Sequence, residues 1–172
     1  CAQGCFDNLF KLKHVECLCN PLAGFEGTKP VKKSASPKKI LVAGAGPAGM
    51  TAALTAHSRG HDVIIYESQA RSGGQLYLAA CPPGRDEFVQ LAKDLETQIG
   101  VKKIPIILKT KVTPEIIKKE KPDIIILATG AKPLIPSIPG IDLPHVVESW
   151  DVLQDKVFTG KKIAIIGGGA VG

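Results

Sequence analysis

The sequence predicts an α/β fold with a doubly wound parallel sheet, and three observations support this prediction. Short apolar runs without alternation recur along the 172 residues, as in strands that are buried on both faces. Segments with the periodicity of amphipathic helices lie between these runs. Two of the runs lead directly into glycine-rich sequences of the form G-x-G-x-x-G, which are typical of a strand-to-helix turn in such a sheet.

The first glycine-rich turn follows the apolar run of residues 40–43. In this turn, Gly44 allows a tight bend, Gly46 lets backbone N–H groups approach a pyrophosphate, and Gly49 lets the following helix pack on the strand. A pyrophosphate would lie at the N-terminus of that helix, where unpaired amides and the helix dipole favour anions. The candidate binding residues are those of the whole turn: Gly44, Ala45, Gly46, Pro47, Ala48 and Gly49.

A complete βαβ unit surrounds this turn. We expect a helix from Pro47 to about Arg59 and a second strand over residues 63–66. The second strand ends at Glu67, which lies 23 residues after Gly44, about where the dinucleotide fingerprint places an acidic side chain for a ribose hydroxyl. The alternative interpretation is a structural βαβ unit that binds no ligand.

The remaining elements alternate in the same way. Residues 86–99 carry apolar side chains at helical spacing, and we expect Gly100 to close this helix. The other expected elements are a strand over 104–108, a short helix from Thr113, a buried strand over 123–129 and a short helix over 149–153. Four parallel strands therefore fit within residues 40–129, and a ligand crevice is expected at their carboxyl ends.

A second strand and glycine turn lie at the end of the sequence. Residues 163–166 are apolar and lead into Gly167, Gly169 and Gly172, which repeat the G-x-G-x-x-G spacing. Because each fingerprint binds one dinucleotide, the chain predicts two nucleotide sites about 120 residues apart. The sequence begins with a cysteine and ends within this motif, so we expect it to be part of a longer protein.

Composition and charge exclude several classes of function. A hydrophobic content of 44% with 22% charged residues is ordinary for a globular protein. No apolar run is long enough to span a membrane and no signal peptide is visible, so we expect a cytoplasmic protein with no membrane partner. The formal net charge is +6, but the basic residues are spread along the chain without interleaved aromatic residues. We therefore expect no nucleic-acid partner.

Four of the five cysteines precede the first strand, with the spacing C-x3-C-x11-C-x-C: Cys1, Cys5, Cys17 and Cys19. In an intracellular protein, clustered cysteines bind a metal more often than they form disulfides. A tetrahedral zinc site with four thiolate ligands is one interpretation. The fifth, Cys81, has no second cysteine nearby for a dithiol mechanism, and we expect it to be a buried or partly buried structural residue.

The two fingerprints resemble those of the flavoproteins with two dinucleotide-binding domains, in which the first holds FAD and the second holds NAD(P)H. The loop Gly73-Gly74-Gln75 and the turn Ala128-Thr129-Gly130 strengthen this resemblance. The resemblance implies an adenosine ribose on Glu67. It also implies a flavin near Gly74 and Gln75, an adenine at the backbone of Val112, and a pyrophosphate lined by Thr129 and Gly130.

The cysteine spacing resembles that of a narrower family. Cys1-x3-Cys5-x11-Cys17 is similar to the last three ligands of a C-x2-C-x3-C-x11-C site. That site occurs in the iron–sulfur flavoproteins related to 2,4-dienoyl-CoA reductase, 2-enoate reductase, trimethylamine dehydrogenase and NADH oxidase. The resemblance covers essentially the whole sequence and implies that Cys1, Cys5 and Cys17 bind a [4Fe–4S] cluster. The family's first cluster cysteine would precede Cys1, and Cys19 is the alternative fourth ligand.

The resemblance also implies a domain organisation and an activity. Residues 1–29 would be the iron–sulfur segment, 30–39 a linker, 40–160 the first part of an FAD-binding domain, and 161–172 the first strand and glycine loop of an NAD(P)H-binding domain. In the family, a barrel domain with FMN precedes this piece. Electrons pass from NAD(P)H through FAD and the cluster to FMN, which reduces an activated C=C bond of an enoate or enoyl-CoA.

Several alternatives and further expectations accompany this interpretation. One alternative is an electron-input subunit similar to the small subunit of glutamate synthase, and another is a non-enzymatic nucleotide- or zinc-binding module. The expected partners are the dinucleotide cofactors and the barrel domain of the same chain, and a homo-oligomeric parent is left open. No catalytic acid or base for the substrate step is identifiable, so we expect these 172 residues to be inactive by themselves.

Overall fold

A computed structural model describes residues 4–27 and 30–168 of the chain. Its centre is a four-stranded parallel sheet in the order β3-β2-β1-β4. The strands are β1 (Lys39–Ala43), β2 (Asp62–Tyr66), β3 (Ile106–Ile107) and β4 (Ile124–Leu127). This arrangement confirms the predicted α/β fold with a doubly wound parallel sheet.

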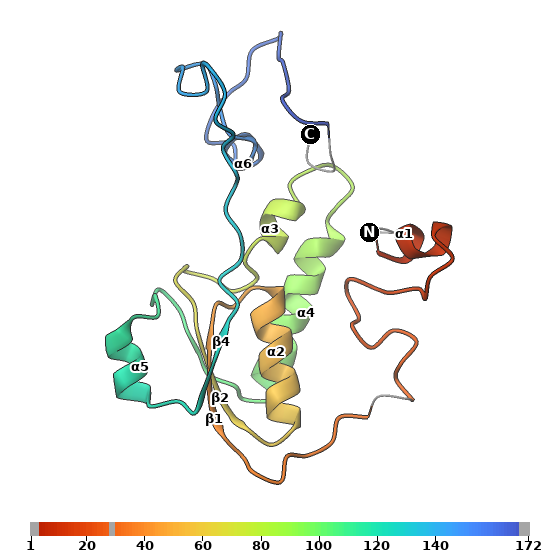
Figure 1. Cartoon of the computed structure of the whole chain (residues 1–172), viewed down its shortest axis with the longest axis vertical. Coiled ribbons are helices and arrows are strands. Elements are labelled where there is room, and N and C mark those ends of the chain that lie inside the picture. Colours follow the sequence, from red (N-terminus) through yellow and green to blue (C-terminus); the bar gives the residue numbers. More distant parts are fainter. Residues whose placement is uncertain (1–3, 28–29, 169–172) are drawn as a thin grey trace.

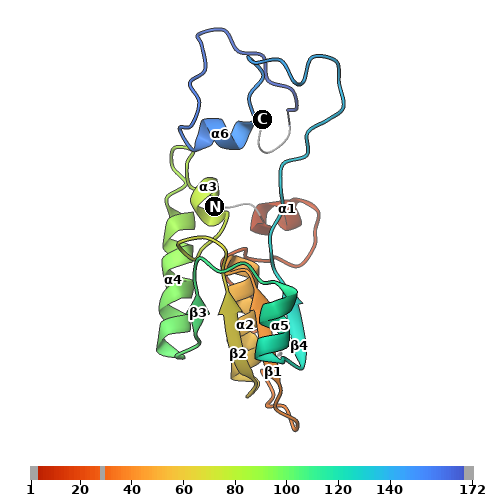
Figure 2. The ribbon, with the colours of Figure 1, turned by 90° about the vertical axis from the view of Figure 1, so that its left-hand side faces the viewer.

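Helices cover both faces of the sheet (Figure 1). One face is covered by α2 (Pro47–Ser58), with α3 (Leu76–Ala79) and α4 (Glu87–Val101) beyond it, and the other by α5 (Pro114–Glu120). Two further helices, α1 (Gly4–Phe10) and α6 (Ser149–Leu153), lie away from the sheet (Figures 1 and 2). The three layers place the carboxyl ends of the strands at one edge, where the glycine-rich turn begins.

The central strand β1 is buried because it has neighbours on all sides. Ile40 and Val42 point into the larger core, which α2 and α4 complete. Leu41 and Ala43 point to the other face, where they meet Tyr66 and side chains near α5. The unbroken apolar run predicted this two-sided burial, since alternate side chains of a strand face opposite layers.

The helices on the larger core begin and end close to their expected bounds. Pro47 is the first residue of α2, where its missing N–H costs nothing, and Gly49, Met50, Ala53 and Ala56 are its buried residues. Helix α4 buries Phe88, Ala92, Leu95 and Ile99. The expectation that Gly100 closes α4 was wrong: the helix continues through Gly100, and Lys103 has the left-handed backbone after its end.

Strand β4 differs from the sequence prediction. The prediction was a buried strand over 123–129, whereas three of the four residues of β4 are exposed and Leu127 is 78% exposed. The strand pairs with β1 on one side only, so it forms an edge of the sheet. An apolar run predicts burial on both faces, but it does not show which part of the polypeptide supplies the cover.

Three smaller segments also depart from expectation. Strand β3 has two residues rather than the predicted 104–108, and the turn of helix α3 was not predicted. Residues 163–166 form no strand in the described part of the chain, and Ile163, Ile165 and Ile166 are exposed there. A strand needs a neighbour for its backbone donors and acceptors, and none lies beside these residues among those described.

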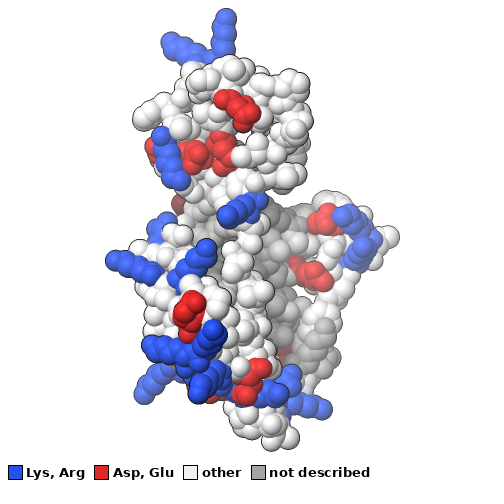
Figure 3. Space-filling view, turned by 60° about the vertical axis from the view of Figure 1, so that its left-hand side comes forward, with Lys and Arg blue, Asp and Glu red and all other residues white. Residues whose placement is uncertain are grey.

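The surface carries charges of both signs. On the face that includes α5, basic side chains gather toward the lower end with acidic side chains among them (Figure 3). Lys118 and Lys119 belong to the last turn of α5, where a positive charge is favourable to the helix dipole. Within the described residues, no helix combines the length and the hydropathy needed to cross a lipid bilayer.

Candidate dinucleotide-binding site

The turn between β1 and α2 is the centre of the candidate site, and its tight packing requires glycine at two positions. Gly44 has a φ of +110°, and a Cβ atom there would lie 2.3 Å from the carbonyl oxygen of Ala128. A Cβ atom on Gly49 would lie 1.9 Å from the carbonyl oxygen of Gly44. Both contacts are with backbone atoms, which cannot move aside cheaply. The first and third glycines of the fingerprint therefore hold strand, turn and helix together.

Gly46 differs from these two glycines because its surroundings are open. A Cβ atom there would meet only the Cα of Gly74, at 4.0 Å. Met50 N–H donates to the carbonyl of Gly46, whereas the N–H groups of Gly46, Ala48 and Gly49 have no acceptor among the described residues. Unpaired N–H groups at the start of a helix, beside free space, fit a pyrophosphate.

Glu67 is buried at the carboxyl end of β2 and faces the glycine-rich turn. Its Oε2 accepts a hydrogen bond from Ala45 N at 2.7 Å. Its Oε1 accepts from Gln69 N at 2.8 Å and from Ser68 Oγ at 3.2 Å. A carboxylate has about four acceptor positions, so these bonds leave capacity for a hydroxyl group. The expected contact with a ribose stays a prediction, and the bond to Ala45 was not predicted.

The loop Gly73-Gly74-Gln75 forms a second wall beside the turn. Gly73 N donates to the carbonyl of Ala45 at 2.8 Å, and a Cβ atom on Gly74 would lie 3.0 Å from the Cα of Gly46. Gly73 and Gly74 have φ values of +101° and +53°, which favour glycine. Two motifs that are separate in the sequence thus come into direct backbone contact.

A third segment, Ala128-Thr129-Gly130, completes the site from the end of β4. The Cα of Thr129 would lie 3.4 Å from a Cβ atom on Gly44. Gln75 Nε2 donates to the carbonyl of Ala131 at 2.8 Å. A Cβ atom on Gly130 would lie 3.1 Å from the same amide nitrogen. The Gln75 side chain therefore fastens the glycine loop to the segment after β4, a contact that sequence spacing could not reveal.

Val112 lies in the segment that follows β3. Thr110 N donates to the carbonyl of Glu67 at 2.8 Å and Lys109 N to that of Gln69 at 2.9 Å, so this segment runs beside the end of β2. The Val112 side chain packs against the smaller core on the α5 face. This position leaves the proposed contact of its backbone with an adenine as a prediction.

The cysteines of the N-terminal segment do not come together in the described part of the chain as the glycine-rich segments do. Cys1 lies outside the described residues, Cys5 is in α1, and Cys17 and Cys19 are exposed. Desolvation of the Cys19 thiol, followed by the charge of the neighbouring Cys17 thiol, raises the pKa of Cys19. No three potential metal ligands gather among residues 4–27 and 30–168. The cluster assignment of Cys1, Cys5 and Cys17 therefore stays a prediction.

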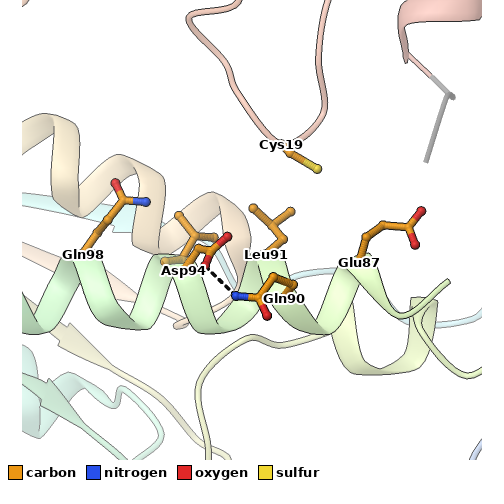
Figure 4. Close-up of a pocket in the computed structure, with 7 residues that line it drawn as sticks. Cys19, Glu87, Gln90, Leu91, Asp94 and Gln98 are labelled. Carbon is orange, nitrogen blue, oxygen red and sulfur yellow. Dashed lines mark hydrogen bonds between the residues drawn. The ribbon is translucent and has the colours of Figure 1, made fainter.

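Cys19 connects this segment to the nucleotide-binding layer. Its side chain points toward α4 and lines a groove with Glu87, Gln90, Leu91 and Asp94 (Figure 4). Within the groove, Gln90 Nε2 donates to Asp94 Oδ1 at 2.8 Å. The groove lies along α4 rather than at the glycine-rich turn.

The remaining expected residues lie apart from the site. Cys81 was expected to be buried or partly buried, but it is exposed at the end of α3, where Pro82 and Pro83 turn the chain, and its thiol donates to the carbonyl of Tyr77 at 3.3 Å. Gly167 has a φ of +103°, and the other glycines of the second fingerprint, Gly169 and Gly172, lie outside the described residues.

Comparison with known proteins places this geometry in a family. The pyridine nucleotide-disulphide oxidoreductase family matches residues 38–172. A metal reductase of Desulforamulus reducens is 43% identical over 176 residues, covering 100% of this chain and 26% of the relative. A cinnamate reductase of Clostridium sporogenes is 36% identical, covering 100% of this chain and 26% of the relative. The chain thus spans about a quarter of the length of these relatives.

A solved structure of a related reductase has a similar sequence and a similar fold. The complex of 2-naphthoyl-CoA reductase with 2-naphthoyl-CoA is 38% identical, with a TM-score of 0.84 over 93% of this chain and 24% of that chain. These matches extend over the cysteine-rich segment as well as the nucleotide-binding layers. The chain therefore belongs to the pyridine nucleotide-disulphide oxidoreductase family, in its dienoyl-CoA reductase-like branch.

Proposed function

We propose that this chain is the FAD-binding part of an NAD(P)H-dependent flavin oxidoreductase. The observation that supports it best is the open turn at the start of α2, where three N–H groups have no acceptor among the described residues. When bound, FAD supplies two-electron acceptance from a nicotinamide and release of single electrons. The protein supplies the binding site, the orientation and the electrostatic surroundings.

Each wall of the site has a proposed role toward FAD. The N–H groups of Gly46 and Ala48 bind the pyrophosphate, and Glu67 accepts a hydrogen bond from the adenosine ribose. Gly74 and Gln75 lie beside the flavin end, and Thr129 and Gly130 line the opposite side of the pyrophosphate. The contacts among the glycine-rich turn, the Gly73-Gly74-Gln75 loop and the segment after β4 support this assignment, because these three segments lie directly against one another.

For the parent protein, we propose the reduction of an activated C=C bond of an enoate or enoyl-CoA, with NAD(P)H as the electron source. The proposal includes a [4Fe–4S] cluster on Cys1, Cys5, Cys17 and a cysteine that precedes them, and FMN in a preceding barrel domain. It is supported by the cysteine spacing and by the names of two relatives, a cinnamate reductase and a 2-naphthoyl-CoA reductase. The second fingerprint, from Gly167 to Gly172, is the proposed start of the NAD(P)H site.

Cofactor analysis of the full-length protein tests this proposal. The protein is purified without oxygen, its cofactors are released, and FAD, FMN, iron, sulfide and zinc are quantified per chain. We expect FAD and FMN together with about four iron and four sulfide per chain. FAD and iron without FMN would favour an electron-input subunit like that of glutamate synthase, and zinc without flavin would leave only a nucleotide- or zinc-binding module.

A further inference from the structure

A buried hydrogen bond lies directly behind the glycine loop of the candidate site. The Ser72 hydroxyl donates to the Glu96 carboxylate, and this bond joins the loop to α4. Ser72 is only 6% exposed, and Glu96 is partly buried on the helix. No buried side-chain oxygen or nitrogen lacks a partner in the described part of the chain. Loss of the carboxylate would therefore leave the Ser72 hydroxyl unpaired in a buried place.

The loop that Ser72 precedes needs such an anchor. Two consecutive glycines with positive φ have many alternative conformations, and fixing them costs more conformational entropy than fixing other residues. On the turn side, the loop is held by the bond from Gly73 N to the Ala45 carbonyl. On the opposite side, the hydrogen bond from Ser72 to Glu96 is the matching attachment, one residue away.

Close packing connects the Ser72–Glu96 hydrogen bond to the space beside the glycine-rich turn. A Cβ atom on Gly73 would lie 2.5 Å from the ring of Tyr77 and 3.1 Å from the Cβ of Ala92 on α4, so the loop fits tightly against the helices. The next residue, Gly74, lies against Gly46 at the mouth of the turn. A shift of Ser72 away from α4 would therefore move the wall beside the unpaired N–H groups.

We propose that Ser72 and Glu96 are positioning residues for the FAD site, which act by holding the Gly73-Gly74 loop in its binding conformation. The inference rests on the proposed FAD site. Neither side chain touches the cofactor in this scheme. Their hydrogen bond orders the loop before FAD binds, so that binding does not have to supply the conformational entropy of ordering it. Loss of the bond should therefore raise the rate of FAD dissociation more than it lowers the rate of association.

The test compares FAD binding in variants of the full-length protein. Apoprotein of each variant is titrated with FAD, flavin fluorescence gives the Kd and the dissociation rate, and visible circular dichroism reports the surroundings of the bound flavin. We expect Ser72→Ala and Glu96→Ala each to weaken FAD binding by about five- to twentyfold, which is less than the full effect of one hydrogen bond to a charged group, because part of that loss falls on the stability of the apoprotein. The double variant should be no weaker than either single variant, because each already breaks the same bond.

Two further variants separate this role from a general effect on stability. Glu96→Gln keeps an oxygen acceptor for the Ser72 hydroxyl and should restore most of the affinity. Thr97→Ala removes a hydroxyl from the next residue of the same helix, where it donates to the Lys93 carbonyl, and should leave the Kd unchanged. If Ser72→Ala does not fold, the comparison of Glu96→Ala with Glu96→Gln still decides the question.

The outcomes distinguish the two proposals. Variants with the Kd, dissociation rate and circular dichroism of the unmodified protein would overturn the positioning role while leaving the FAD site intact. Additive losses in the double variant would also overturn it, because they would show two independent effects. A full-length protein that binds no FAD at all would instead overturn the proposed function on which the inference rests.

Discussion

The glycines of the fingerprint are not equivalent, and the structure separates their roles. Gly44 and Gly49 are required by the protein itself, since a side chain at either would collide with backbone. Gly46 has a φ of −75° and open space, so any small residue could adopt its conformation. Its glycine is therefore explained by the space that a ligand needs rather than by the packing of the chain.

This difference leads to a prediction for two alanine substitutions. Gly49→Ala should destabilise the protein by about 2–3 kcal/mol, because overpacking against backbone forces the helix away from the strand. Gly46→Ala should leave the stability unchanged within about 0.5 kcal/mol and weaken FAD binding by about tenfold or more, which corresponds to 1.4 kcal/mol of lost contact. Thermal unfolding and FAD titration of the full-length variants give both quantities.

Gly100→Ala is a matched control for these glycine substitutions. Gly100 lies inside α4, and a Cβ atom there would meet nothing within 4 Å. Alanine should therefore stabilise the helix by about 0.5–1 kcal/mol and leave the FAD affinity unchanged. Equal losses of FAD in Gly46→Ala and Gly100→Ala would contradict the special role of Gly46.

Substitutions of Cys17 and Cys19 test which of these two thiols binds the proposed iron–sulfur cluster. We predict that Cys17→Ser in the full-length protein loses the iron and sulfide but retains FAD, because Cys17 is a proposed cluster ligand and lies outside the FAD site. Cys19→Ser should retain all three, since Cys19 points toward α4. Iron, sulfide and flavin are quantified after purification without oxygen. Loss of iron in Cys19→Ser alone would exchange the roles of the two thiols.

Among the elements, α5 is attached to the sheet by a polar group of three side chains. Glu120 Oε1 accepts a hydrogen bond from Tyr66 Oη at 2.8 Å, and its Oε2 lies 3.0 Å from Lys39 Nζ. The Lys39 ammonium also donates to the Glu120 carbonyl at 2.6 Å. Because these residues come from α5, β2 and β1, the end of this helix is fixed to two strands at once.

The charge of Glu120 makes this attachment dependent on pH. The hydrogen bond from Lys39, followed by that from Tyr66, lowers the pKa of Glu120 below its ordinary value of 4.5. A depressed pKa in the folded state stabilises that state above the unfolded value, and this contribution disappears as the pH falls through the folded value. The attachment should therefore be complete above about pH 4.5 and weaken below it.

Glu120→Gln should consequently reduce the protection of α5 amides against hydrogen exchange at pH 7. The difference from the unmodified protein should shrink below pH 4.5, where the unmodified carboxylate is itself progressively protonated. Tyr66→Phe removes one of the two attachments and should give a smaller effect. Lys118→Gln, in the last turn of the same helix, is the control, because the Lys118 charge does not contribute to the lowered pKa of Glu120. A difference that stays constant with pH would show that the carboxylate charge is not involved.

Among the described residues, most of the exposed large apolar side chains lie in three parts of the chain. They are the cysteine-rich segment, strand β4 and the residues that follow the sheet. Phe10 is 79% exposed, Leu127 78% and Phe158 97%. Exposed apolar groups of this size are typical of surfaces that other parts of a protein cover. Since the chain spans about a quarter of its relatives' length, we propose that further polypeptide of the same protein covers β4.

Leu127 tests this proposal. Leu127→Lys should destabilise the full-length protein by about 2–4 kcal/mol, as expected when a charged group replaces a buried leucine. The same substitution in a chain limited to residues 1–172 should change its stability by less than about 0.5 kcal/mol, because Leu127 is already exposed there. Thermal unfolding of both pairs measures the effect. Equal tolerance in both lengths would show that β4 stays an exposed edge.

Local patterns were sufficient to predict most of the sheet and its helices. The apolar run before Gly44, the proline at the start of α2 and the helical spacing of residues 86–99 act on neighbouring residues, so their consequences can be derived without a structure. The G-x-G-x-x-G spacing likewise predicted the tight turn at β1, because the steric need for glycine is local.

Contacts between segments that are far apart in the sequence became known only from the tertiary structure. The contact of Gly74 with Gly46, the bond of Gln75 to the segment after β4, and the Ser72–Glu96 pair each join parts of the sequence that spacing does not relate. The exposure of β4 and the absence of a strand at residues 163–166 have the same origin. An apolar run determines that a segment can be a buried strand, but its neighbours in space determine whether it becomes one.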